Sequence, residues 1–273
     1  MVGTIGTVAS NQLTQEYTRI LSQSNVALSG VRPTYVNQLK QDRLVKSLKQ
    51  DGSWNLIDVL YIFANDESTG NFALLNWTNP SLYSLTKINS PTFISNRGYT
   101  GGTNVFLSSS WSPSQGVNFL QNSASFGGMI YDNAIAGILL GNASGSGALA
   151  GQSPVYLVPR VASTYRYSLN SGRIASTVPQ NFMGRRVLGV FRSSSATVEA
   201  LYPSSSTVDG FVVTAATSLA RTTLNATVLQ GMDQNNRLFG ANNTASMAWW
   251  GGYGIRNRIS TFTGSMTTYI NSI

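Results

Sequence analysis

The side chains that could do chemistry in this chain are restricted by the absence of two residue types. The sequence of 273 residues contains no histidine and no cysteine. Catalytic pairs of serine or cysteine with histidine, thiolate metal sites and disulfide bonds therefore cannot form. Most hydrolase mechanisms and the usual zinc and copper ligands are excluded, and acid–base work by carboxylates is the main chemistry that remains.

Two carboxylates could still cleave a glycosidic bond, because such acids need not be close in sequence. The candidates for this role are Asp132, Glu199 and Asp209. No strand-like run places alternating acids on one face, and the adjacent pair Asp66-Glu67 lies in a predicted turn. Neighbouring strand residues would in any case point to opposite faces. We therefore predict that the chain is not an enzyme, with a glycan hydrolase as the least favoured alternative.

No cofactor is expected. The segment Gly251-Gly252-Tyr253-Gly254 lacks the remaining spacing of a phosphate-binding loop and is interpreted as a tight bend. Calcium is the one ion that the sequence leaves open, because Asp132-Asn133 and the run at 233–236 could supply loop oxygens. Turn formation explains both clusters equally well.

Two aromatic side chains are candidates for stacking on glycans. Tyr99 lies beside glycines, and Trp111 is flanked by Ser110, Ser112 and Pro113 in a loop-like context. Rings exposed at such positions could stack on sugars. The alternative is burial in the core, because both side chains carry large apolar areas.

Four basic residues, Lys40, Arg43, Lys46 and Lys49, recur every third residue. On a helix this spacing produces an oblique basic ridge. It is interpreted either as a solvated helix face or as a surface that docks to an acidic neighbour in a larger particle. The remaining basic residues are scattered singly or in pairs, so the net charge of +8 does not indicate a nucleic-acid partner.

The elements that must position these residues are helices at both ends of the chain. We predict a flexible arm over residues 1–12 and helices over 11–28 and 33–51. In the second helix Pro33 is expected at the first helical position and Gly52 at the C-terminal cap. A last helix is marked by apolar residues from Ile255 to Ile270.

Between the helices, short apolar runs alternate with turn residues and predict a two-sheet antiparallel sandwich. The predicted strands are 59–63, 92–94, 105–107, 125–130, 138–140, 155–158, 165–169, 187–191, 197–202, 211–214, 224–229, 238–240 and 247–250. Asp209-Gly210 is expected in a hairpin turn and 141–151 in a mobile loop. In Trp249-Trp250, one ring should enter the core and the other meet the terminal helix or a neighbouring subunit. The division predicted is 1–52, an arm and helical attachment region, and 53–273, the sandwich with its terminal helix.

The low content of charged residues is relevant to where the protein is located. Only 10% of the residues are charged, and neutral polar residues fill the surface positions instead. Such a surface suits a protein packed in an assembly or displayed on a particle. The first residues do not form a secretory signal, and no run approaches the ~20 apolar residues of a membrane helix. We therefore expect synthesis in the cytoplasm and no membrane partner.

Several segments together suggest a family. They are 48–54, Asp58–Phe63, Trp77-Thr78-Asn79-Pro80, Asn89-Ser90-Pro91-Thr92-Phe93 and the terminal helix. Their order resembles that of the concanavalin A-like, laminin-G-like jelly rolls in structural proteins of tailed phages, notably the crAss-like phages. The resemblance implies a mainly β, two-sheet antiparallel jelly-roll sandwich with N-terminal helices and a C-terminal helix.

The same resemblance implies a function without catalytic residues. The chain would be a structural component of a virion: a head fibre, a capsid decoration protein or a tail fibre. Its partners would be other capsid or tail proteins and further copies of itself in a homo-oligomer, and display would bring host surface carbohydrate within reach. The alternative is a carbohydrate-binding adhesin module.

Overall fold

Helices lie at both ends of the chain in the computed structural model, and strands lie between them. The structure describes residues 12–27, 31–102, 104–132, 137, 139–142, 155–161, 164–172, 174–177, 185–202, 210–232, 238–240 and 243–273. The α-helices are α1 (Gln15–Ala27), α2 (Tyr35–Gln50) and α3 (Ile259–Ser272). The 3-10 helices are η1 (Trp54–Leu56), η2 (Phe72–Leu74), η3 (Pro113–Gln115) and η4 (Tyr253–Arg258).

The larger sheet has eight strands in the order β13-β12-β11-β6-β17-β4-β3, with β1 paired to β17 beside that path. Its strands are β1 (Ile57–Ile62), β3 (Thr92–Ile94), β4 (Gly98–Thr100), β6 (Ala124–Ile130), β11 (Arg186–Arg192), β12 (Thr197–Tyr202), β13 (Gly210–Ala215) and β17 (Thr244–Gly251). Strand β17 pairs with β6 along one side and with both β1 and β4 along the other. Segments from both ends of the chain therefore meet at this strand.

The second sheet has seven strands in the order β10-β9-β8-β7-β14-β5-β2. Its strands are β2 (Thr86–Ile88), β5 (Phe106–Ser108), β7 (Leu140–Asn142), β8 (Tyr156–Val161), β9 (Thr164–Ser168), β10 (Ile174–Thr177) and β14 (Ala226–Val228). Strands β15 (Gln230–Met232) and β16 (Leu238–Gly240) form a separate pair. All these pairings are antiparallel, which confirms the predicted mainly β, two-sheet sandwich with helices at both ends.

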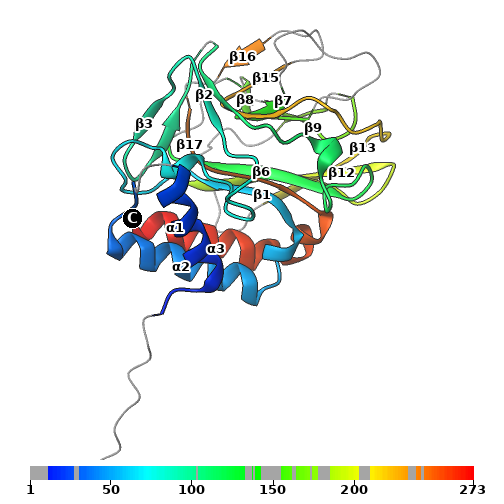
Figure 1. Cartoon of the computed structure of the whole chain (residues 1–273). Helices are drawn as coiled ribbons and strands as arrows, with labels where there is room; N and C mark the ends of the chain where they lie inside the picture. Colours follow the sequence, from blue (N-terminus) through cyan, green and yellow to red (C-terminus); the bar gives the residue numbers. More distant parts are fainter. Residues whose placement is uncertain are drawn as a thin grey trace, which may run out of the picture.

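The core is divided into two layers by the larger sheet. Alternate residues of β1 face opposite sides, so Tyr61 belongs to the cluster between the two sheets. Leu60 and Ile62 belong to the cluster between the larger sheet and the helices. Because both faces of this sheet are covered, nearly every residue of β1 is buried. Figure 1 shows the result, with the three helices lying against the side of the sheet that faces away from the second sheet.

The pair Trp249-Trp250 follows the same alternation. Trp250 lies between the sheets, where its ring is 6.0 Å from that of Trp111. Trp249 faces α3, where its ring meets Phe262 edge to face at 5.0 Å. This confirms the predicted split, with the terminal helix as the second partner.

Helix α2 differs from its prediction at the start. Thr34 is its N-cap and accepts a hydrogen bond from the backbone N–H of Asn37, so Pro33 precedes the helix and is not its first residue. Threonine is favoured at this position because its hydroxyl satisfies an otherwise unpaired N–H. Gly52 follows the helix with φ +76°, as expected for a glycine that ends one.

The structure also corrects the strand assignments. Strands β2, β4, β10 and β15 were not predicted. Gly141 and Asn142 lie in β7 rather than in the predicted loop, and the rest of that loop lies outside the described residues. Residues 1–11 of the arm predicted over 1–12, and Asp209, are also outside them.

Candidate docking surface of the helical layer

Three helices form the layer that carries the predicted basic ridge. Tyr17 and Ile20 of α1, Val45 of α2, and Phe262 and Met266 of α3 are all buried in the cluster that faces the larger sheet. In α3 the glycine and threonine content disfavours an isolated helix, so this packing holds it in place. The polar faces of the helices are left toward solvent.

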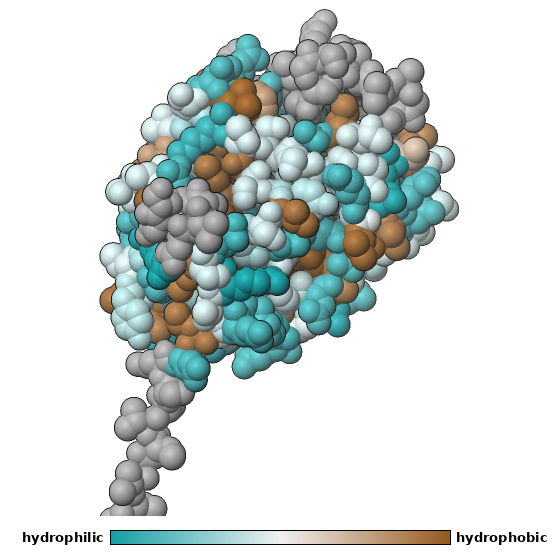
Figure 2. Space-filling view, in the orientation of Figure 1, coloured by the Kyte–Doolittle hydropathy of each residue, from teal (hydrophilic) through white to brown (hydrophobic). Residues whose placement is uncertain are grey.

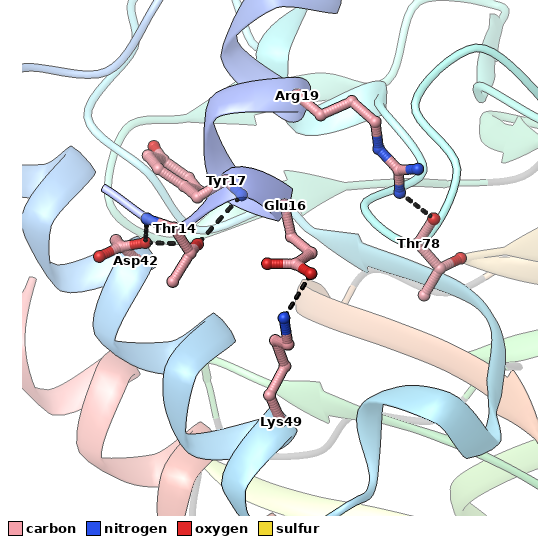
Figure 3. Close-up of polar contacts among 7 residues, drawn as sticks. All are labelled: Thr14, Glu16, Tyr17, Arg19, Asp42, Lys49 and Thr78. Carbon is pink, nitrogen blue, oxygen red and sulfur yellow. Dashed lines mark hydrogen bonds and ion pairs between the residues drawn. The ribbon is translucent and has the colours of Figure 1, made fainter. Parts of the chain in front are cut away.

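The C-terminal half of the ridge is used within the chain. Lys46 forms an ion pair with Asp42 one turn earlier, at 2.7 Å. Lys49 forms an ion pair with Glu16 of α1, which Figure 3 shows joining the two helices. The hydrogen bond from Lys49 lowers the pKa of Glu16 below its ordinary value. These two cations are therefore already neutralised by neighbours.

Asp42 holds the start of α1 against α2. Its Oδ1 accepts hydrogen bonds from the Thr14 backbone N–H at 2.8 Å and from the Thr14 hydroxyl at 2.6 Å (Figure 3). Burial alone would raise the pKa of Asp42, but the hydrogen bonds from Lys46 and Thr14 outweigh it and leave the pKa below its ordinary value. The charged Asp42 carboxylate therefore links α2 to the start of α1.

The N-terminal half of the ridge faces α3. The Lys40 ammonium donates a hydrogen bond to the Ser272 carbonyl at the C-terminal end of α3, where unpaired carbonyls favour a cation. Arg43 is exposed and has no hydrogen bond or ion pair to any described residue. The structure thus separates the four predicted docking residues into two groups, which the spacing alone did not indicate.

A groove of about 460 Å³ lies between α2 and α3 beside Lys40 and Arg43. Its lining residues are Lys40, Arg43, Leu44, Ser47, Gly264, Ser265, Thr268, Tyr269 and Ser272. The α3 residues in this set were missed in the sequence. The sequence feature that could have identified them is the recurrence of small residues at Gly264, Thr268 and Ser272. These residues lie one turn apart on the helix face opposite Phe262 and Met266.

The glycan-stacking prediction is wrong for both of its residues. Tyr99 is fully buried, and its hydroxyl donates to the Gly70 carbonyl at 2.7 Å. Trp111 is 1% exposed and packs edge to face on Phe119 at 5.9 Å. Both rings bury their large apolar area between the two sheets, which agrees with the alternative interpretation that they belong to the core.

The carboxylates considered for glycoside cleavage have separate structural partners. Glu199 is buried, pairs with Arg256 at 2.8 Å and accepts a hydrogen bond from the Tyr253 hydroxyl at 2.9 Å. Asp132 is exposed and accepts a hydrogen bond from the Thr244 hydroxyl at 2.5 Å.

In the part of the chain that the structure describes, no group of three or more acidic side chains is placed to hold a metal ion. Asn133 and residues 233–236, which were considered for calcium, lie outside that part. No described helix is both long enough and apolar enough to span a bilayer.

Several arginines that raise the net charge bind backbone carbonyls inside the protein. Arg192 is buried and donates to the carbonyls of Leu169, Ser194 and Ala216. Arg221 donates to three carbonyls of the segment 113–119. A planar fork of donors suits arginine for this task. The positive charge is thus partly structural, and Figure 2 shows a face with hydrophilic and intermediate residues around small, separate apolar groups.

Comparisons with known proteins identify no family. No family model matches the chain, and no curated protein does. Among solved structures, the chain is similar to a mutant of Trypanosoma rangeli sialidase displaying trans-sialidase activity, at 11% identity and a TM-score of 0.47. The match covers 85% of this chain and 39% of that one, so this chain spans about two fifths of the sialidase's length.

Proposed function

We propose that the chain is a non-enzymatic structural component of a tailed-phage virion, displayed as a head fibre, a capsid decoration protein or a tail fibre. In this proposal the helical layer attaches the protein to the capsid or tail, and the sandwich is presented outward. The observation that carries it is the arrangement of α1, α2 and α3 as one layer on the larger sheet, with a basic groove at its surface (Figure 1).

The residues that suggested the family also support a framework role. Asp58 accepts hydrogen bonds from the backbone N–H groups of Val117, Asn118 and Phe119 and so fixes that loop to β1. Trp77 is buried against α1, with its ring 5.9 Å from Tyr17. These residues hold the sandwich together and join it to the helices, which is what a displayed scaffold requires.

The described carboxylates support a non-enzymatic role because each has a partner in the chain. The sequence has ten acids, of which Asp209 and Asp233 lie outside the described ranges. The other eight accept hydrogen bonds or form ion pairs within the chain: Glu16, Asp42, Asp51, Asp58, Asp66, Glu67, Asp132 and Glu199. Contacts of this kind are typical of structural ion pairs and turns, and none of the eight carboxylates lines the groove between α2 and α3.

A carbohydrate-binding module was the alternative. It depended on Tyr99 and Trp111 as exposed stacking residues, and both rings lie in the core. The two residues on which this alternative depends are therefore not exposed to stack on a sugar.

The test is electron cryo-microscopy of virions produced from the genome that encodes the chain. We expect repeated density on the capsid or tail that fits the sandwich, with the helical layer directed toward the particle. Mass spectrometry of the same purified particles gives an independent measurement. Absence of the chain from intact particles would overturn the proposal.

A further inference from the structure

We infer that the groove between α2 and α3 binds a short acidic segment of a partner protein. This inference deepens the proposed attachment role and rests on it. The groove is built by side chains of α2 and α3, which are about 200 residues apart in the sequence. It therefore exists only in the folded helical layer.

The shape of the groove fits a peptide rather than a single ion. Its volume of about 460 Å³ lies within the usual range of ligand pockets. Leu44 and Tyr269 are buried, and a Cβ atom added at Gly264 would meet no atom of a neighbouring element within 4 Å. The open space above Gly264 is therefore available to an incoming chain.

The charges of the groove determine the chemistry of its occupant. Lys40 and Arg43 line the α2 side, whereas no aspartate or glutamate is among the lining residues. On the α3 side, the Ser265 and Ser272 hydroxyls donate to the carbonyls of Thr261 and Tyr269, and the Thr268 hydroxyl has no hydrogen bond to a described residue. A carboxylate suits this lining, because an arginine fork can bind both of its oxygens and a hydroxyl can donate to one of them.

The amount of free charge argues against a polyanion such as a nucleic acid or an anionic membrane. Lys46 and Lys49 continue the ridge but are paired with Asp42 and Glu16. Binding of anionic lipid usually requires a cluster of about four to eight basic residues, and nucleic acid requires several phosphate contacts. Lys40 donates to the neutral Ser272 carbonyl and keeps its charge, and Arg43 has no hydrogen bond or ion pair to a described residue. These two cations beside the groove are suited to a few carboxylates.

A second copy of this chain is also a poor occupant. Its eight described acids are all engaged in hydrogen bonds or ion pairs of their own. A second copy therefore offers, among its described residues, no carboxylate without a partner, whereas an acidic segment of another protein brings carboxylates that are free to bind. We assign the acidic segment to a different protein, and light scattering tests the second copy.

The test uses the full chain and a fluorescein-labelled short peptide of alternating glutamate and serine, with a glutamine-for-glutamate peptide as the probe control. Fluorescence anisotropy gives the Kd for the wild type and for two double variants. Lys40→Gln/Arg43→Gln removes the two groove cations, and Lys46→Gln/Lys49→Gln removes the same charge from the same helix outside the groove.

We expect the wild type to bind the acidic peptide and not the glutamine peptide. The groove variant should weaken binding at least about tenfold, as loss of charge-assisted hydrogen bonds implies, and the control variant should stay within about twofold. A third variant, Gly264→Gln, should retain the fold and block the peptide sterically.

Three results would overturn the inference. They are no measurable binding of the acidic peptide, equal weakening in both double variants, and undiminished binding to Gly264→Gln. Light scattering of the unlabelled protein tests for self-association. If the wild type forms dimers and the groove variant does not, the occupant of the groove is a second copy of the chain, and the inference of an acidic partner is wrong.

The outcomes for the groove and for the virion proposal are separable. If the chain binds the peptide but is absent from purified particles, the inference about the groove stands and the proposed virion role is wrong. If the Lys40→Gln/Arg43→Gln variant is incorporated normally into particles, the groove is not the attachment site, and the proposed virion role stands.

Discussion

Trp249 and Phe262 meet edge to face at 5.0 Å, and this contact joins the central strand of the larger sheet to α3. Both side chains are fully buried. The contact explains how a helix rich in threonine and serine stays attached, because its stability comes from the sheet beneath it rather than from its own sequence.

Replacing Phe262 with alanine tests this attachment. We expect the change to lower the free energy of unfolding by about 3–5 kcal/mol, since it leaves a cavity against Trp249. Urea denaturation followed by circular dichroism measures the loss. Phe262→Leu, which keeps most of the volume, should cost clearly less, and equal costs for the two variants would contradict the packing argument.

Gly264→Ala should stabilise the protein by about 0.5–1 kcal/mol. The added methyl group meets no atom within 4 Å, and alanine loses less conformational freedom than glycine in a helix. Gly127→Ala is the matched control, because its methyl group would lie 2.2 Å from both the Leu188 carbonyl and the Trp249 ring. Thermal unfolding of both variants should shift in opposite directions, and a lower melting temperature for Gly264→Ala would contradict the open groove.

Arg192 and Arg186 lie at the two ends of β11 and should respond very differently to replacement by leucine. Arg192→Leu leaves buried carbonyls without donors and should cost about 3 kcal/mol or more. Arg186 is exposed, and its replacement should change stability by no more than about 0.5 kcal/mol. Similar denaturation midpoints for the two variants would show that the carbonyl contacts contribute little.

The stabilising effect of the Asp42 carboxylate should depend on pH. Its pKa in the folded protein lies below the ordinary value of 3.8, so its contribution is complete above that value. The contribution is lost as the pH falls through the lower, folded-state pKa. Asp42→Asn should therefore cost about 1.5–3 kcal/mol at neutral pH and much less in strong acid. A difference from wild type that stays constant across this range, measured by urea denaturation, would contradict the assignment.

Local patterns in the sequence predicted the parts of the fold that depend on neighbours along the chain. Helix α2 follows from its apolar spacing and Gly52, and the split of Trp249 and Trp250 follows from strand alternation. The three-residue strands β2 and β4 are too short to show a period and, unlike β3 and β16, contain no two adjacent apolar residues, so their pairing partners define them.

The candidate site was predictable only in part for the same reason. The ridge on α2 is a local pattern, whereas the ion pair between Lys49 and Glu16 and the groove beside α3 depend on contacts between distant segments. Burial of Tyr99 and Trp111 likewise depends on the second sheet, which glycine and serine neighbours did not reveal.

The position of β17 at the centre of the larger sheet decides when a newly made chain can fold. Ile57 pairs with Gly251, so β1 has no partner on this side until the much later strand β17 has left the ribosome. Until then β1 and β6 each have an open, apolar edge, the kind of surface that promotes aggregation of nascent chains. Closing such long-range pairs is slow, and a truncation before residue 244 removes the strand that joins the two halves of the sheet.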